Sequence, residues 1–179
     1  MTLKPLQENR RILTAAAGYI AAPVLMCIPF LHHSWFEYNY TTLINDAHQL
    51  TVFMLCMMPD LALLFYFFLT AGAGTKPRFS WTAQCILTAA LIIIILLIPY
   101  HEERDFLSNL HVLLAYAAYL SSALLLYQLI WMRQDLVRIF LASFVLQVFL
   151  IMYSGAISGI SEVLYGITLS VILTKLKLS

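Results

Sequence analysis

Apolar residues follow one another along this chain in long runs, and short polar segments separate the runs. A helix that crosses a bilayer needs about 20 apolar residues, and six runs reach or approach that length. They cover residues 12–31, 50–70, 81–100, 106–131, 136–153 and 157–173. Strands of a membrane barrel would instead alternate polar and apolar side chains. The pattern therefore predicts an all-α protein, a bundle of six transmembrane helices that forms one membrane domain over residues 1–179.

Small and polar residues distinguish the first and last of these runs. In the first run, small residues recur four positions apart, as Ala17 with Ala21 and Gly18 with Ala22. This spacing is typical of membrane helices that pack closely against a neighbour. The sixth run is the least apolar, because serine, glycine and Glu162 interrupt its start. It is consequently the weakest of the six predictions.

The basic residues divide unevenly between the two ends of the expected bundle. With six spans, nine lysines and arginines fall on one side: Lys4, Arg10, Arg11, Lys76, Arg78, Arg133, Arg138, Lys175 and Lys177. Arg104 falls on the other side. Cytoplasmic loops carry an excess of lysine and arginine, so this distribution places both termini in the cytoplasm. We expect the protein to be integral to a cell membrane, the plasma membrane in particular.

The composition agrees with this assignment and excludes two classes of protein. Apolar residues make up 62% of the chain and charged residues 11%, whereas soluble domains are about half apolar and a quarter charged. This excludes a water-soluble enzyme. The net charge of +1 excludes a strongly basic nucleic-acid-binding protein.

The most costly polar residue inside a predicted span is Asp60. It lies about ten residues into the second run, close to the middle of the bilayer, where an aspartate costs about 2.5–3.5 kcal/mol. We expect its side chain to face the bundle interior and to find a hydrogen-bond donor on a neighbouring span. The candidate donors are Gln84, Thr88, Ser122 and Gln147.

A second polar group is predicted at the end of the bundle that is opposite the termini. His111 and Glu162 each lie about five residues into their spans, so they have similar depths and can pair. Pairing reduces the cost of burying each side chain. Together with His48, His101 and Asp60, they predict a polar ligand pocket that opens to the outer leaflet. A purely structural hydrogen bond between two spans remains the alternative.

The same end offers weak candidates for a metal site. His48, His101, Glu102 and His111 supply nitrogen and oxygen ligands, but their spacing matches no zinc motif. No cofactor is predicted, and zinc is only a minor alternative. Solvated loop residues or contacts with lipid head groups explain these side chains more simply.

One stretch of the fourth run and the start of the sixth resemble a known group of membrane proteins. His111, Ala115, Tyr119 and Ser122 follow a spacing similar to the helix H-x-x-x-A-x-x-x-aromatic-x-x-small of that group, and Ser161-Glu162 is similar to the start of its last helix. The group contains FGF-receptor-activating-protein-like, DRAM-like and GPI-lipid-remodelling proteins and related bacterial proteins of unknown function. The resemblance implies six spans, cytoplasmic termini, a role in lipid handling or membrane trafficking, and His111 and Glu162 as the marked polar pair.

These observations predict a membrane protein that binds or handles a lipid or other amphiphile through the pocket at its outer side. Three alternatives stay open. They are a metal- or serine-dependent lipid hydrolase, a structural or assembly protein, and a small transporter with Asp60 beside Pro59. The expected partner is membrane lipid, with a second copy or another membrane protein as further candidates.

Overall fold

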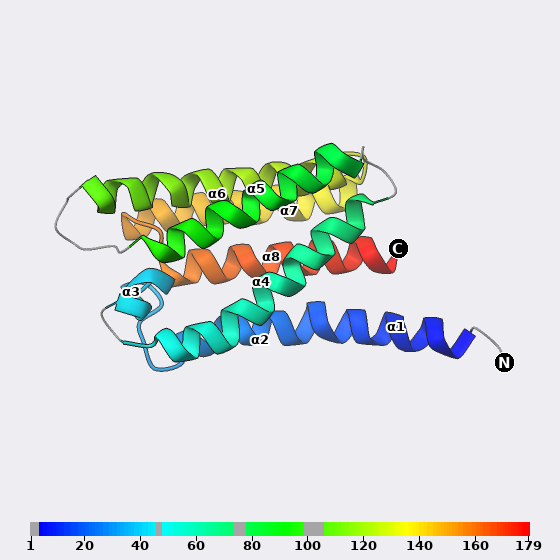
Figure 1. Ribbon diagram of the computed structural model, residues 1–179, viewed down its shortest axis with the longest axis horizontal. Coiled ribbons are helices and arrows are strands. Elements are labelled where there is room, and N and C mark those ends of the chain that lie inside the picture. Colours follow the sequence, from blue (N-terminus) through cyan, green and yellow to red (C-terminus); the bar gives the residue numbers. More distant parts are fainter. Residues whose placement is uncertain (1–3, 46–47, 74–77, 99–105) are drawn as a thin grey trace.

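The computed structural model describes residues 4–45, 48–73, 78–98 and 106–179, and every regular element among them is helical (Figure 1). The first span is one continuous rod made of α1 (Lys4–Ala16), the π-helical turn η1 (Ala17–Ala21), α2 (Ala22–Cys27) and the 3₁₀ turn η2 (Ile28–Phe30). The remaining elements are α3 (Tyr40–Asn45), α4 (Leu50–Gly72), α5 (Arg78–Leu97), α6 (Phe106–Ile130), α7 (Gln134–Ser154) and α8 (Gly159–Leu178).

Six of these helical segments are long and apolar enough to cross a membrane, which confirms the predicted number. The predicted boundaries lie within three residues of the helix ends in most places. The largest differences are at the ends nearest the termini, where the first span already begins at Gln7 and the last continues to Leu178. Charged residues extend these two helices beyond their apolar runs.

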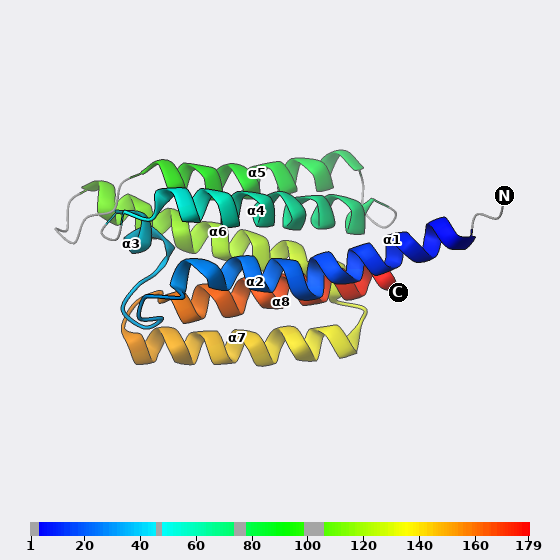
Figure 2. The ribbon, with the colours of Figure 1, turned by 90° about the horizontal axis from the view of Figure 1, so that it is seen from below.

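The last helix in the chain, α8, lies in the centre of the bundle. It runs between the first span and the group α5, α6 and α7, with α4 crossing beside it (Figures 1 and 2). More than half of α8 is buried, although its mean hydropathy of 1.4 is the lowest of the six spans. A helix surrounded by protein needs no apolar lipid-facing side, so its serines, threonines and glycines can serve helix contacts.

The π-helical turn in the first span results from a proline and is completed by α8. The backbone N–H of Ala22 donates to the carbonyl of Ala17, five residues back. In that register the donor to the Gly18 carbonyl would be residue 23, which is proline and has no N–H. The Ser170 hydroxyl donates to this carbonyl instead, at 2.6 Å. A hydroxyl from a neighbouring helix thus satisfies the backbone group that the proline leaves open.

Glycines allow the first span and α8 to approach closely. A Cβ atom on Gly18 would lie 1.7 Å from Oγ1 of Thr174, and one on Gly166 would lie 2.5 Å from Sδ of Met26. Gly18 and Ala22 are both buried in this contact, whereas Ala21 is exposed. Of the two predicted small-residue pairs, Gly18 with Ala22 is therefore the one that packs against another helix.

Hydrogen bonds between side chains join α6, α7 and α8 inside the apolar bundle. The Tyr119 hydroxyl donates to Gln147, whose amide donates to Ser143 at 2.8 Å. Ser143 in turn bonds Thr168 of α8 at 2.6 Å. A second connection joins Ser122 to the hydroxyl of Tyr165, also at 2.6 Å. Polar side chains placed in this way hold membrane helices in one register.

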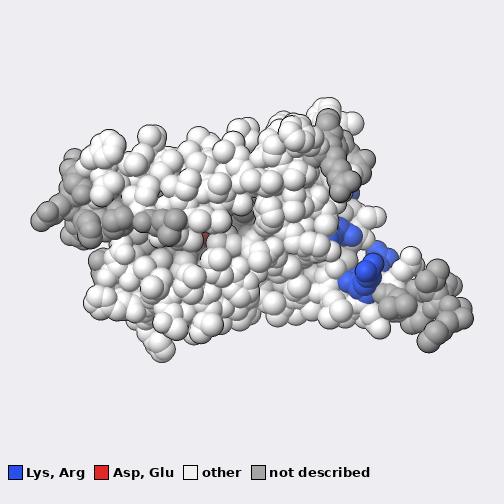
Figure 3. Space-filling model, viewed as in Figure 1, with Lys and Arg blue, Asp and Glu red and all other residues white. Residues whose placement is uncertain are grey.

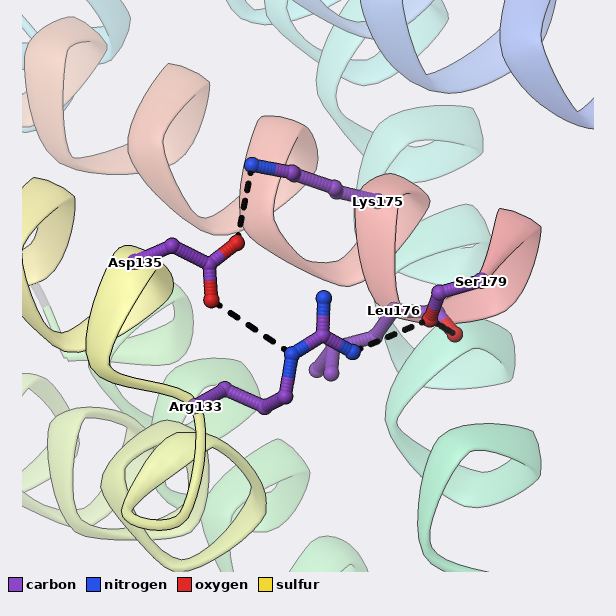
Figure 4. A network of polar contacts seen from close by, with 5 residues as sticks. All are labelled: Arg133, Asp135, Lys175, Leu176 and Ser179. Atoms are coloured by element: carbon purple, nitrogen blue, oxygen red, sulfur yellow. Dashed lines mark hydrogen bonds and ion pairs between the residues drawn. The ribbon is translucent and has the colours of Figure 1, made fainter.

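The described lysine and arginine side chains gather at the end of the bundle that carries both termini (Figure 3). There, Asp135 at the start of α7 accepts from Lys175 at 3.0 Å and from Arg133 at 3.4 Å, and Arg133 also bonds Ser179 (Figure 4). These contacts fix the α6–α7 turn against the end of α8. They are exposed, and such pairs stabilise a protein by at most about 1 kcal/mol each.

Candidate functional site

A short helix closes the opposite end of the bundle. Residues 31–45, here called the cap, leave the first span as a loop and end in α3 (Figure 1). Two reciprocal hydrogen bonds stabilise the start of α3. Asn39 Oδ1 accepts from the backbone N–H of Thr42 at 2.9 Å, and Thr42 Oγ1 accepts from the N–H of Asn39 at 2.8 Å. This arrangement satisfies two N–H groups that the helix itself leaves open.

The cap is fastened to the first turn of α8 by backbone contacts. The N–H groups of Gly159 and Ile160 donate to the carbonyls of Tyr38 and Trp35, at 2.7 and 2.9 Å. Position 159 requires glycine, because a Cβ there would lie 2.2 Å from the Phe30 ring and 2.8 Å from the Tyr38 oxygen. The cap therefore replaces solvent or a side chain as the partner of the first N–H groups of α8.

Glu162 connects α8 to α3. Its Oε2 accepts a hydrogen bond of 2.8 Å from the backbone N–H of Tyr40, the first residue of α3. Acidic groups are favourable at helix N-termini, where unpaired N–H groups carry partial positive charge. Glu162 is thus a side chain of one helix that caps another.

His111 of α6 is buried and reaches the next residue of the cap. Its Nε2 lies 3.2 Å from Oγ1 of Thr41, and its Nδ1 lies 3.0 Å from the carbonyl oxygen of Ile98. A carbonyl only accepts, so Nδ1 carries a hydrogen, and in a neutral ring Nε2 accepts from the Thr41 hydroxyl. His111 and Glu162 therefore hold consecutive residues of α3. A direct contact between the two stays a prediction.

Tyr40 joins this polar cluster to the first span and to α4. Its hydroxyl donates to the carbonyl of Met26 at 2.9 Å. In the 3₁₀ register of η2 the donor for that carbonyl would be residue 29, which is again a proline. Burial raises the pKa of Tyr40 far above its usual range, and the nearby carboxyls of Glu162 and Asp60 raise it further. The phenol is consequently a hydrogen-bond donor at any physiological pH.

Asp60 lies inside the bundle without a partner. It is 1% exposed, and no described residue makes a hydrogen bond with either of its carboxyl oxygens. The prediction that a polar residue of a neighbouring span bonds it is wrong. Each candidate donor is engaged elsewhere: Gln84 with Gln128 and Ser80, Thr88 with Ser121, Ser122 with Tyr165, and Gln147 with Tyr119 and Ser143. These residues serve helix packing on the α5–α8 side.

The remaining candidate residues are placed less favourably or lie outside the described residues. His48 is exposed just before α4, in a left-handed backbone conformation with φ of 52°. His101 and Glu102 belong to the residues that the structure does not describe. Among the described residues, no three histidine, cysteine, aspartate or glutamate side chains are grouped as a metal site.

Sequence reasoning missed the residues that bring the cluster together. Tyr40 and Thr41 lie in a short loop helix and belong to no apolar run. The available signal was Asn39-x-x-Thr42, a pair suited to begin a helix. The two prolines of the first span also indicated open backbone carbonyls that side-chain donors would have to satisfy.

Comparisons with known proteins give no match: no family model, no curated protein and no solved structure matches this chain.

Proposed function

We propose that this chain is an integral membrane protein that binds the polar head of a lipid or other amphiphile at the capped end of its bundle. The site comprises Glu162, His111 and the residues of α3 that they hold. The six long apolar helices are compatible with a membrane location. The resemblance of the His111 and Glu162 segments to lipid-handling six-span proteins supports the same proposal.

The observation that carries the proposal is how the cap is attached. The bonds from Glu162 to the Tyr40 N–H and from His111 to the Thr41 hydroxyl are single contacts between groups that a polar head group can replace. An exchange of one hydrogen bond for another costs little net free energy, because each bond contributes only about 0.5–1.5 kcal/mol. Binding can therefore replace the contacts that Glu162 and His111 make with α3 and give both side chains a new partner.

A further part of the proposal concerns orientation. The basic side chains and the two termini share one end of the bundle (Figure 3), and such an end faces the cytoplasm by the positive-inside rule. The capped end would then face the outer leaflet of the plasma membrane. A reporter that is active only in the cytoplasm, fused after Ser179, should be active. If a reporter that is active only in the periplasm or outside the cell is active at that position instead, the proposed orientation is wrong.

Lipid co-purification tests the binding function. Wild-type protein, extracted in mild detergent, should carry lipid that native mass spectrometry detects, and a His111→Ala/Glu162→Ala variant should carry less. A His32→Ala/Glu37→Gln variant is the matched control, because both residues are exposed in the same cap. If all three proteins carry the same lipids in the same amounts, the binding site is not where we propose it.

A further inference from the structure

We infer that the head group accepted at this end is a primary ammonium, and that Asp60 is its counter-ion. This inference rests on the proposed function and specifies the chemical class of the ligand. It begins from the buried, unpartnered carboxyl group of Asp60.

Asp60 stands in the buried stripe of α4, about 15 Å from the start of this helix at 1.5 Å per residue. Its neighbours on that stripe are Phe53, Cys56, Met57 and Leu64, none of which donates a strong hydrogen bond. A carboxylate is acceptor-only, so its unused capacity is for a ligand that brings N–H or O–H groups. A positive charge on that ligand would also offset the cost of the buried acid.

The charges around the cap favour a cation over an anion. The lysine and arginine side chains that the structure describes lie at the opposite end of the bundle, so they cannot neutralise a phosphate or carboxylate head here (Figure 3). On the capped side, Glu162 accepts from the Tyr40 N–H at 2.8 Å, and Asp60 shares the buried side of α4 with Phe53, whose ring lies 5.6 Å from that of Tyr40. An anionic head would meet two acids, whereas an ammonium would meet two counter-ions.

Aromatic rings line the same region. The ring of Tyr40 lies 5.0 Å from that of Phe30 and 5.6 Å from that of Phe53, and Trp35 lies 5.5 Å from Phe30. The faces of such rings attract cations. Phe53 and Asp60 are seven residues apart and lie on the same buried side of α4, with Phe53 nearer the cap.

The backbone supplies a further acceptor in this region. In the closed cap, the Tyr40 hydroxyl donates a hydrogen bond to the Met26 carbonyl oxygen. If α3 moved away, Tyr40 would move with it, and this oxygen could accept a hydrogen bond from a ligand. An ammonium has three N–H donors and can therefore bond carboxylate and carbonyl oxygens alike. A quaternary ammonium has the charge but no donor, so the inference predicts discrimination between the two.

Four probes distinguish the possible ligands on full-length protein in a mild non-ionic detergent. Dodecylamine carries the proposed head, dodecyltrimethylammonium has charge without N–H, dodecanoate is anionic, and butylamine lacks the long chain. Affinities come from native mass spectrometry and from the shift of the unfolding temperature. Dodecylamine should bind at least ten times more tightly than each of the others, and Asp60→Asn should weaken it at least tenfold, which is about 1.4 kcal/mol.

The controls separate a failure of this inference from a failure of the proposed function. Glu37→Gln removes an exposed acid from the same cap and should leave dodecylamine binding unchanged. Asp60→Asn is nearly isosteric, and the unfolding temperature of the free protein shows whether it folds; Asp60→Leu provides a second variant. Equal dodecylamine affinity in wild type and Asp60→Asn overturns the role of Asp60. Equal affinity of wild type for all long-chain probes overturns the ammonium class but keeps amphiphile binding. Binding of no probe, with no co-purified lipid, overturns both.

Discussion

Replacement of Gly18 with alanine tests the close approach of the first span to α8. The new Cβ would lie 1.7 Å from Oγ1 and 2.8 Å from Cβ of Thr174, whereas carbon contacts are favourable at about 3.5–4.0 Å. The two helices must therefore separate or distort locally. Separation also lengthens the 2.6 Å bond from the Ser170 hydroxyl to the Gly18 carbonyl.

The expected change in the free energy of unfolding combines one stabilising and two destabilising contributions. Alanine favours a helical backbone over glycine by about 0.5–1 kcal/mol. Overpacking costs about 1–3 kcal/mol, and an interhelical hydrogen bond in a membrane protein contributes about 0.6 kcal/mol on average. The clash outweighs the helix propensity, so we expect Gly18→Ala to lower the free energy of unfolding by about 1–3 kcal/mol.

Equilibrium unfolding in mixed micelles, with a denaturing detergent as titrant, measures this difference. Thr174→Ala removes two of the three atoms that the new Cβ meets, so the double variant should recover about 1 kcal/mol relative to the sum of the single changes. Ala21→Leu adds bulk at an exposed position of the same turn and should change stability by less than about 0.5 kcal/mol. A Gly18→Ala protein as stable as wild type, or a double variant without recovery, would refute the packing argument.

Three further changes address the cap and the buried acid. Glu162→Ala should speed hydrogen exchange of the Tyr40 amide and of α3, and Glu162→Gln, which keeps an acceptor, should restore most protection; unchanged exchange in both would contradict the capping role. Tyr40→Phe should cost about 1–2 kcal/mol through the lost bond to Met26. Because burial raises the pKa of Tyr40 in the folded state, this part of the stability is present below the unfolded value of about 10 and declines as pH rises above it. Unfolding curves of the Tyr40→Phe variant should lack that decline, and a persistent decline would assign it to another group. Asp60→Leu should raise the ligand-free unfolding free energy by about 1 kcal/mol, since it removes an unpaired buried polar group; a loss of similar size would reveal a partner.

The sequence alone was sufficient for the number, the type and most boundaries of the long helices, because apolar runs report directly on contact with lipid. It also identified Gly18 and Ala22 as a packing pair. The sixth span was the weakest prediction for a physical reason. Hydropathy measures suitability for lipid, whereas α8 is mostly surrounded by protein, and its Ser170, Thr174 and Gly166 serve contacts with the first span.

The site was only partly accessible from the sequence. Matched depth predicted His111 and Glu162 as a pair, and both side chains contact α3, but depth carries no information on rotation about the helix axis or on the loop that lies beside them. Tyr40 and Thr41, which receive both side chains, lie in a helix of six residues that no periodicity reveals. The partner of Asp60 was mispredicted because each candidate donor faces a neighbour within the α5–α8 group.

The central position of α8 has a consequence for biosynthesis. In a membrane-inserted chain helices enter the bilayer in chain order, so the five spans before α8 would reach it before the element against which the first span packs has been synthesised. Gly18 and Ser170 are separated by 152 residues, so their bond forms only after α8 has been synthesised. Until then the open backbone carbonyl of the first span and the polar faces of α6 and α7 lack their final partners. Assembly is therefore a late step, and a chain that stops before α8 lacks the helix that contacts the first span, α4 and α7.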